Sequence, residues 1–297
     1  MAEEKQSIEP AEGFSPDWLR LREPADHQAR SALLTEKLAR WRESFADFSV
    51  VDLGSGTASN FRYLCPKLGM NQRWTLLDND VGLLSCIAER LAEWAIDTNS
   101  KFDRISSNSA TITHASFNAH LTWQSCDLAK ELETIDFENT HLITGSALLD
   151  LTSAAWMSQL ARIIKAQQCA SLFVLSYNGK LYWQPELQFD KPITELLNAH
   201  QLNDKGFGNA LGPSAYEYLM GELTNHAIES EPADWLLEHD SHAIQRVLIS
   251  DWAAAATEQN PIRSNAINEW AQQRAKFLEN ESSVLRVGHV DTLSLPT

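Results

Sequence analysis

The segment from Asp52 to Thr57, which reads Asp-Leu-Gly-Ser-Gly-Thr, carries the clearest chemical signal in the sequence. It follows a short apolar run. Its two glycines predict a turn from a strand to a helix, where the backbone can approach a ligand and the helix offers free N–H groups. Dinucleotide-binding folds use the same turn, but they normally carry an apolar residue in place of Asp52 and a third glycine in place of Ser59. Since a carboxylate at position 52 opposes a pyrophosphate, the turn favours a ligand with positive charge.

Two more acids are expected where the next strands of a parallel sheet end. Asp78 follows the apolar run 74–77, and Asp127 follows the run 121–124. The carboxyl ends of parallel strands meet in one crevice, and an acid at the second strand end can accept the ribose hydroxyls of an adenosine ligand. Asp127 is placed to accept the exocyclic amine of adenine. The three acids together predict a site for an adenosine-containing ligand.

As a set, these residues resemble class I S-adenosylmethionine-dependent methyltransferases, and the resemblance covers roughly residues 48–177. The first motif of that family, an acid followed by GxGxG, is similar to residues 52–58, with Ala58 in the place of the third glycine. The resemblance implies S-adenosyl-L-methionine as the cofactor and S-adenosyl-L-homocysteine as its product. The cofactor-binding residues that it implies are Arg22, Arg30, Asp52, Gly54, Ser55, Gly56, Asp78, Asn79, Asp127, Leu128 and Ser146.

The same resemblance extends to the acceptor side of the reaction. Residues 143–151 are similar to the family's substrate-facing region, and residues 287–291 to its last, antiparallel strand. Some methyl acceptors need a general base, and the candidates are Asp150, Tyr177 and His289. Asp150 could instead cap the helix that begins near Ser153, and Tyr177 could be a buried core residue.

The N-terminal segment resembles the helical lid that such enzymes place over the methionine end of the cofactor. Ser15 followed by Pro16 predicts a helix start. Pro24 predicts a break in that helix, where a lid could hinge. Either Arg22 or Arg30 would then pair with the methionine carboxylate, which suits the planar fork of arginine. The alternative for both is a surface charge on an exposed helix face.

Strands and amphipathic helices alternate around these motifs, which predicts a parallel sheet covered on both faces. After residue 177 the alternation gives way to a polar stretch near 205–208, a strand-like segment, two amphipathic helices and a final strand at 284–295. We expect an α/β fold with a Rossmann-like, seven-stranded, mostly parallel sheet whose last strand is antiparallel. Residues 1–47 would form a tail and helical lid, and residues 48–297 a methyltransferase domain with insertions at about 97–118 and 181–225 and helical insertions toward the C-terminus.

Composition narrows the class of partner. The 297 residues include 24 Lys and Arg against 40 Asp and Glu, which gives a net charge of −16 and makes a nucleic-acid partner improbable. The apolar runs fall far short of the ~20 residues that cross a bilayer, and the first residues lack the apolar core of a signal peptide. The four cysteines form no CxxC pair, which argues against a zinc site or a disulfide framework and fits a reducing cytoplasm.

These observations lead to one expected function and two alternatives. We expect a cytoplasmic enzyme that transfers a methyl group from S-adenosylmethionine to an oxygen, nitrogen or carbon of a small molecule, without a metal. A non-catalytic cofactor-binding protein with a degenerate methyltransferase fold is the first alternative. An NAD(P)-dependent Rossmann oxidoreductase is the second, and Asp52 and Ser59 disfavour it. The sequence leaves the oligomeric state open.

Overall fold

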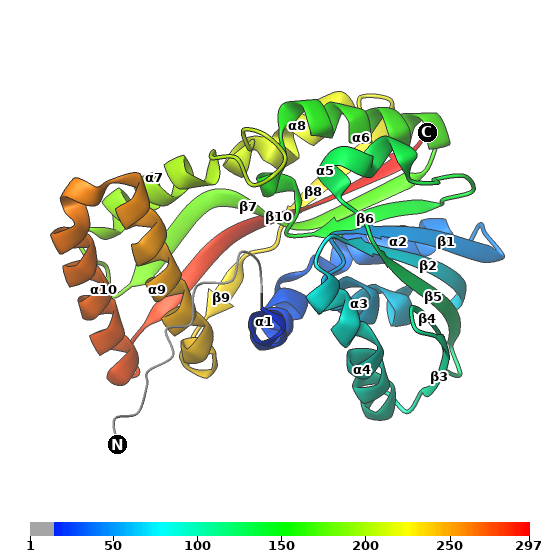
Figure 1. Cartoon of the computed structure of the whole chain (residues 1–297), viewed down its shortest axis with the longest axis horizontal. Coiled ribbons are helices and arrows are strands. Elements are labelled where there is room, and N and C mark those ends of the chain that lie inside the picture. The colour runs from blue at the N-terminus through cyan, green and yellow to red at the C-terminus, as the bar shows by residue number, and fades with distance from the viewer. Residues whose placement is uncertain (1–14) are drawn as a thin grey trace, which may run out of the picture.

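The computed structural model describes residues 15–297 and is built on one large sheet (Figure 1). Its strands are β1 (Asp47–Leu53), β2 (Met70–Asp78), β3 (Lys101–Ser106), β4 (Ser109–Thr113), β5 (Phe117–Ser125), β6 (Leu142–Ser146), β7 (Ala170–Gln184), β8 (His226–Pro232), β9 (Trp235–Leu237) and β10 (Val284–Pro296). Nine of them lie in the order β3-β4-β5-β2-β1-β6-β7-β10-β8, and β9 pairs with β10.

The strand directions match the expected fold class. β5, β2, β1, β6 and β7 run parallel to one another. β10, the last strand in the chain, is antiparallel to both of its neighbours in the sheet order, β7 and β8. The prediction of an α/β fold with a mostly parallel sheet and an antiparallel last strand is therefore confirmed.

The sheet has ten strands rather than seven, because β3, β4 and β9 extend it. The hairpin of β3 and β4 occupies the insertion expected at about 97–118. It adds two antiparallel strands beside β5. Most β3 side chains are exposed and Phe102 packs against the core, so this edge strand carries no apolar run that the sequence could reveal.

Helices cover both faces of the sheet. They are α1 (Pro16–Ala29), α2 (Ala32–Arg42), α3 (Ser59–Leu68), α4 (Val81–Asp97), α5 (Leu128–Glu131), α6 (Ala154–Gln167), α7 (Asp190–Gln201), α8 (Ala215–Glu222), α9 (His242–Gln259) and α10 (Ser264–Glu279). Short 3₁₀ turns lie at Leu132–Thr134, Leu149–Leu151, Gly212–Ser214, His239–Ser241 and Pro261–Arg263. Within residues 15–297, no helix combines the length and apolarity that crossing a membrane requires.

Two apolar layers and one separate cluster make up the core. α2, α3 and α4 bury their apolar faces against one side of the sheet, and α5, α6 and α8 pack on the other (Figure 1). Leu34 and Leu38 of α2 have no exposed surface, so α2 is a packed layer of the sheet.

The C-terminal end of β7 and the N-terminal end of β10 extend beyond the main sheet and form a lobe with α7, α9 and α10 (Figure 1). The rings of Trp183 and Trp270 lie 5.9 Å apart and nearly perpendicular there. The guanidinium of Arg274 lies 4.4 Å from the centre of the Trp183 ring and pairs with Asp190. The helices expected near the C-terminus therefore form a helical lobe beside the sheet.

Helix α1 runs between this lobe and the helices α3 and α4 (Figure 1). Ser15 caps it as predicted, since its Oγ accepts from the backbone N–H of Trp18 at 3.1 Å. The predicted break at Pro24 is wrong, because α1 continues unbroken to Ala29. Proline leaves the carbonyl of Arg20 without its helical partner, but Arg20 and Pro24 are both exposed, so water can take that hydrogen bond.

Candidate functional site

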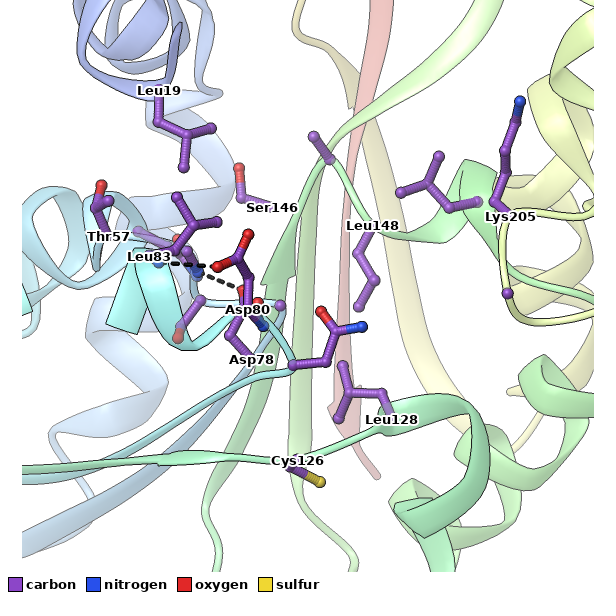
Figure 2. Close-up of a pocket in the computed structure, with 18 of the residues that line it drawn as sticks. Leu19, Thr57, Asp78, Asp80, Leu83, Cys126, Leu128, Ser146, Leu148 and Lys205 are labelled. Atoms are coloured by element: carbon purple, nitrogen blue, oxygen red, sulfur yellow. Dashed lines mark hydrogen bonds between the residues drawn. The ribbon is translucent and has the colours of Figure 1, made fainter. Parts of the chain in front are cut away.

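A cavity of about 880 Å³ opens at the carboxyl ends of β1, β2, β5 and β6 (Figure 2). Helix α1 borders one side of it and the loop 205–207 the other. Most residues predicted to bind the cofactor line this cavity: Arg22, Gly54, Ser55, Gly56, Asp78, Asn79, Asp127, Leu128 and Ser146. Arg30, Asp52, Asp150, Tyr177 and His289 do not line it. The structure thus brings one subset of the predicted residues together and separates the rest.

The turn after β1 forms the floor of the cavity. Gly54 and Gly56 adopt the left-handed region with φ of +66° and +53°, which costs glycine little. A Cβ on Gly56 would lie 3.0 Å from Cδ1 of Leu19, so a side chain there would also require Leu19 to shift. Ala58 takes the same left-handed conformation, with φ of 66°, at the start of α3.

Ser55 supplies a polar group without a partner at this floor. Ser55 lines the cavity, and its buried Oγ makes no hydrogen bond to any residue of the described chain. Buried polar atoms are normally paired, so an unpaired hydroxyl at a cavity wall fits a ligand that carries hydrogen-bonding groups.

Asp78 is the acid nearest to this turn. Its Oδ2 accepts from the N–H of Gly56 at 2.7 Å, and its Oδ1 accepts from the N–H of Asp80 at 2.9 Å. Burial raises the pKa of Asp78, while the backbone N–H groups oppose that shift. Each carboxylate oxygen still has a second lone pair, so Asp78 can accept two more hydrogen bonds from a ligand.

Asp52 lies beneath the turn, behind the cavity wall. Its Oδ1 accepts from Nδ2 of Asn60 at 2.8 Å, and its Oδ2 has no partner among residues 15–297. Burial raises the pKa of Asp52 to about 7, and Asn60 and Arg30 lower it. Asn60 itself lines the cavity. Asp52 therefore acts on the site through the position of Asn60.

The two arginines predicted to hold a carboxylate differ in access. Arg30 is buried, with its guanidinium 4.3 Å from the centre of the Tyr63 ring and 3.8 Å from Asp291. The alternative that Arg30 is a surface charge is wrong. Arg22 reaches the cavity, but it is held by two hydrogen bonds to Asp26, at 2.9 and 3.0 Å.

Helix α1 is fixed over the site by ion pairs. Glu23 accepts from Arg62 at 2.6 and 2.8 Å and from Arg90 at 3.1 Å. Arg62 also donates to the carbonyl of Thr57, in the glycine turn, at 2.6 Å. Arg62 thus links α1 directly to the turn that forms the cavity floor.

Asp127 lies at the rim of the cavity and begins α5. Its Oδ1 accepts from the N–H of Ala129 at 3.1 Å, and its Oδ2 pairs with Nζ of Lys130 at 2.6 Å. The hydrogen bond from Lys130 holds the pKa of Asp127 below its usual range. Both oxygens already have partners, but the side chain remains 36% exposed, so a ligand can still reach it.

The three candidates for a general base form a buried group outside the cavity. His289 is paired with Tyr177 across β7 and β10, with ring centres 6.3 Å apart. Burial raises the pKa of Asp150 to about 6 and lowers the pKa of His289 to about 3. Burial also raises the pKa of Tyr177, whose Oη donates to Asn198 at 2.9 Å. Oδ1 of Asp150 and Nδ1 of His289 have no partner in the described part of the chain.

The alternative role of Asp150 as a helix cap is wrong. Asp150 lies within the 3₁₀ turn Leu149–Leu151, and α6 begins at Ala154, three residues after the end of that turn. Ser153 caps that helix, because its Oγ accepts from the N–H of Trp156 at 3.4 Å.

Sequence reasoning missed several residues that line the cavity: Leu19, Asp26, Asn60, Asp80, Leu83, Lys205 and Phe207. Asp80 carried a signal, since an aspartate before an apolar helix is a typical N-cap, and it accepts from the N–H of Leu83 at 3.1 Å. Lys205 and Phe207 carried none, because only the folded chain brings their loop to the strand ends.

No group of three or more His, Cys, Asp or Glu side chains that could hold a metal occurs within residues 15–297. The lining acids Asp78 and Asp80 have no cationic partner in that part of the chain, whereas Arg22 and Lys130 are neutralised by neighbouring aspartates. The glycine turn therefore faces an environment that disfavours phosphate groups.

No family model and no curated protein matches this chain. Solved structures similar to it include the YcgJ protein from Bacillus subtilis, with a TM-score of 0.49 and 13% identity over 90% of this chain and 100% of that one. A S-adenosylmethionine-dependent methyltransferase from Geobacter sulfurreducens, in complex with S-adenosylhomocysteine, has a TM-score of 0.45 and 14% identity over 95% and 99%. Another from Thiobacillus denitrificans, in the same kind of complex, has a TM-score of 0.44 and 13% identity over 94% and 98%.

Proposed function

We propose that this chain binds S-adenosylmethionine in the cavity at the strand ends and transfers its methyl group to a small molecule. The observation that carries the proposal is the pairing of the left-handed glycine turn with Asp78 at one cavity wall. Asp78 would accept the ribose hydroxyls, and Ser55 with the turn backbone would face the methionine part. Asn79, Asp127 and Leu128 would surround the adenine. The bound cofactor supplies an electrophilic methyl group on a sulfonium.

The hydrogen bond between Gly56 and Asp78 favours this ligand over a dinucleotide. A pyrophosphate binds to free N–H groups at such a turn. Here the N–H of Gly56 is already donated to a carboxylate at 2.7 Å. A phosphate at this position would lie beside the carboxylate of Asp78 and would have one N–H donor fewer. A positively charged sulfonium and the hydroxyl donors of a ribose suit the same surroundings.

The size of the cavity supports a small acceptor. Ligand pockets commonly measure about 300–1,000 Å³, and about 880 Å³ leaves room for a second small molecule beside a nucleoside. The contribution of this chain to such a reaction is to align the acceptor and exclude water. Asp150, Tyr177 and His289 stay predictions for a general base, and each would need to become accessible to act.

Calorimetric titration tests the binding part of the proposal. We expect the purified chain to bind S-adenosylmethionine and S-adenosylhomocysteine, and to bind NAD⁺ at least tenfold more weakly. Tighter binding of NAD⁺ would reject the proposal in favour of an oxidoreductase.

Formation of S-adenosylhomocysteine with a panel of small molecules tests the catalytic part. Binding of the cofactor without product from any acceptor would support the non-catalytic alternative. The cysteine spacing, without a CxxC pair, leads us to propose the cytoplasm as the place of this reaction.

A further inference from the structure

One wall of the cavity carries a cation that the cofactor proposal leaves without a role. The loop 203–210 forms this wall and is fixed by Asp204, whose Oδ1 accepts from the N–H groups of Gly206 at 2.7 Å and Gly208 at 2.9 Å. Its far end is tied to the segment after β6, because the N–H of Leu211 donates to the carbonyl of Thr152 at 2.8 Å. The loop therefore presents Lys205 from a defined position.

Lys205 is the lining cation without a carboxylate partner among residues 15–297. Arg22 is paired with Asp26 and Lys130 with Asp127. Nζ of Lys205 has one polar contact in the described chain, to Nδ1 of His200 at 3.4 Å. An ammonium group has three N–H donors, so Lys205 keeps donors and a full charge for a ligand. In a chain of net charge −16, such a cation at a cavity wall is a local exception.

Apolar side chains line the cavity together with Lys205. Phe207 of the same loop lines the cavity, and its ring packs edge-on against Trp156 with centres 5.4 Å apart. Leu148 and Leu151, which follow β6, continue this surface. An ammonium beside an aromatic and two leucines suits a molecule with an apolar body and one anionic group.

This wall lies opposite the side assigned to the cofactor. Figure 2 shows Lys205 across the cavity from Leu19, Leu83 and Asp80, with Leu148 between the two sides. The glycine turn and Asp78 belong to the side of Leu83, since they end β1 and β2. The two walls therefore offer different chemistry, with acids and backbone groups on one and an apolar surface with a cation on the other.

We propose that Lys205 binds the carboxylate of the methyl acceptor, and that the acceptor is a small carboxylic acid whose apolar body lies on Phe207 and Leu148. This inference rests on the proposed function, since it assigns the second wall of the same cavity. Lys205 is a specificity-determining residue under this assignment, because a charge-assisted hydrogen bond selects the ionised acid over a neutral analogue.

Matched acids and amides test the proposal without knowledge of the natural acceptor. The chain, saturated with S-adenosylhomocysteine, is titrated with 4-hydroxybenzoate and 4-hydroxybenzamide, and with hexanoate and hexanamide. We expect at least one acid to bind about tenfold or more tightly than its amide. Lys205→Met should remove this preference, and Lys205→Arg should keep most of it. Lys191→Met, which removes an exposed cation of α7 that does not line the cavity, should leave it unchanged.

The outcomes separate the two proposals. Equal binding of acids and amides, or binding of neither, overturns the acceptor assignment, and so does a preference that survives Lys205→Met. A fall in affinity for S-adenosylhomocysteine in Lys205→Met that matches the loss for the acid also overturns it, because Lys205 would then hold the cofactor. If the unchanged chain does not bind S-adenosylhomocysteine, the proposed function is contradicted instead. The preference for acids over amides is then measured in the absence of S-adenosylhomocysteine, so the role of Lys205 is still tested.

Discussion

The carboxyl ends of β1 and β2 differ from the region after β6 and across the middle of β7 and β10 in what their polar side chains can reach. Asp78 at the end of β2 lines the cavity. Asp150, which follows β6, and Tyr177 and His289, which lie in the middle of β7 and β10, are buried outside it. The indole of Trp235 on β9 packs 5.1 Å from the ring of His289 and covers that region. Asp78 thus gains access from its place at a strand end, whereas the elements that pack over the second region keep its polar side chains from the cavity.

The two regions also treat charge differently. Two backbone N–H groups stabilise the charged form of Asp78. Burial favours the neutral forms of Asp150 and His289 against the effect of nearby backbone groups, and Oδ1 of Asp150 and Nδ1 of His289 have no partner among residues 15–297. The first region is suited to hold a ligand by ionic hydrogen bonds, and the second acts on stability as pH changes.

The largest effect is expected from His289→Phe. Burial lowers the pKa of His289 from 6.5 to about 3, so the folded chain resists its protonation and loses stability as pH falls through this range. The slope is about 1.4 kcal/mol per pH unit. A phenylalanine at position 289 does not bind a proton, so the variant does not lose stability in this way. The variant should therefore be more stable than the unchanged chain at pH 4. Denaturant unfolding at several pH values measures the free energy of unfolding of both proteins. If the two profiles of this free energy against pH run parallel, burial does not lower the pKa of His289.

Asp150→Asn should change the pH dependence of stability in the opposite direction, over a narrower pH range. Burial raises the pKa of Asp150 from 3.8 to about 6. The unchanged chain therefore loses stability as pH rises from about 4 to 6, at about 1.4 kcal/mol per pH unit. The stability of the variant relative to the unchanged chain should rise over this range and then stay level. A loss of turnover in a stable Asp150→Asn variant would instead support the predicted role as a base.

Asp78→Ala should weaken the binding of S-adenosylhomocysteine by tenfold or more. The loss follows from hydrogen bonds to a charged group, each worth about 1.5–3 kcal/mol, and from the freed N–H of Gly56. Calorimetric titration measures the affinity, and a thermal melt confirms that the variant is folded. Unchanged affinity would reject Asp78 as a ribose ligand and remove the contrast between the two regions.

The smallest effect is expected from Asp127→Asn. Its side chain is partly exposed, and an amide oxygen can still accept from the N–H of Ala129. We expect the affinity for S-adenosylhomocysteine to fall only a few-fold, because solvent screens exposed charges. A loss as large as that of Asp78→Ala would place Asp127 among the main ligands of the adenine.

Strands buried on both faces were the most predictable part of the fold. The short apolar run before the glycine turn is the strand Asp47–Leu53, and the strand expected at 284–295 is observed at Val284–Pro296. Both strands carry many buried apolar side chains, which make such strands visible in the sequence. The hairpin of β3 and β4 escaped prediction because its outer strand faces water. The continuity of α1 through Pro24 was not predicted either. The free-energy cost of a proline inside a helix depends on whether water can reach the carbonyl that loses its hydrogen bond.

The sequence by itself determined the local features of the site, namely the glycine turn after β1, the acid at the end of β2 and the order in which they follow each other. These depend on neighbouring residues, whose backbone preferences act over a few positions. Only the tertiary structure decided that Arg22 reaches the cavity while Arg30 is buried, and that Lys205 faces the strand ends. Burial and access depend on how α1, β9 and the loop 203–210 pack over the sheet, and such packing joins segments far apart in the chain.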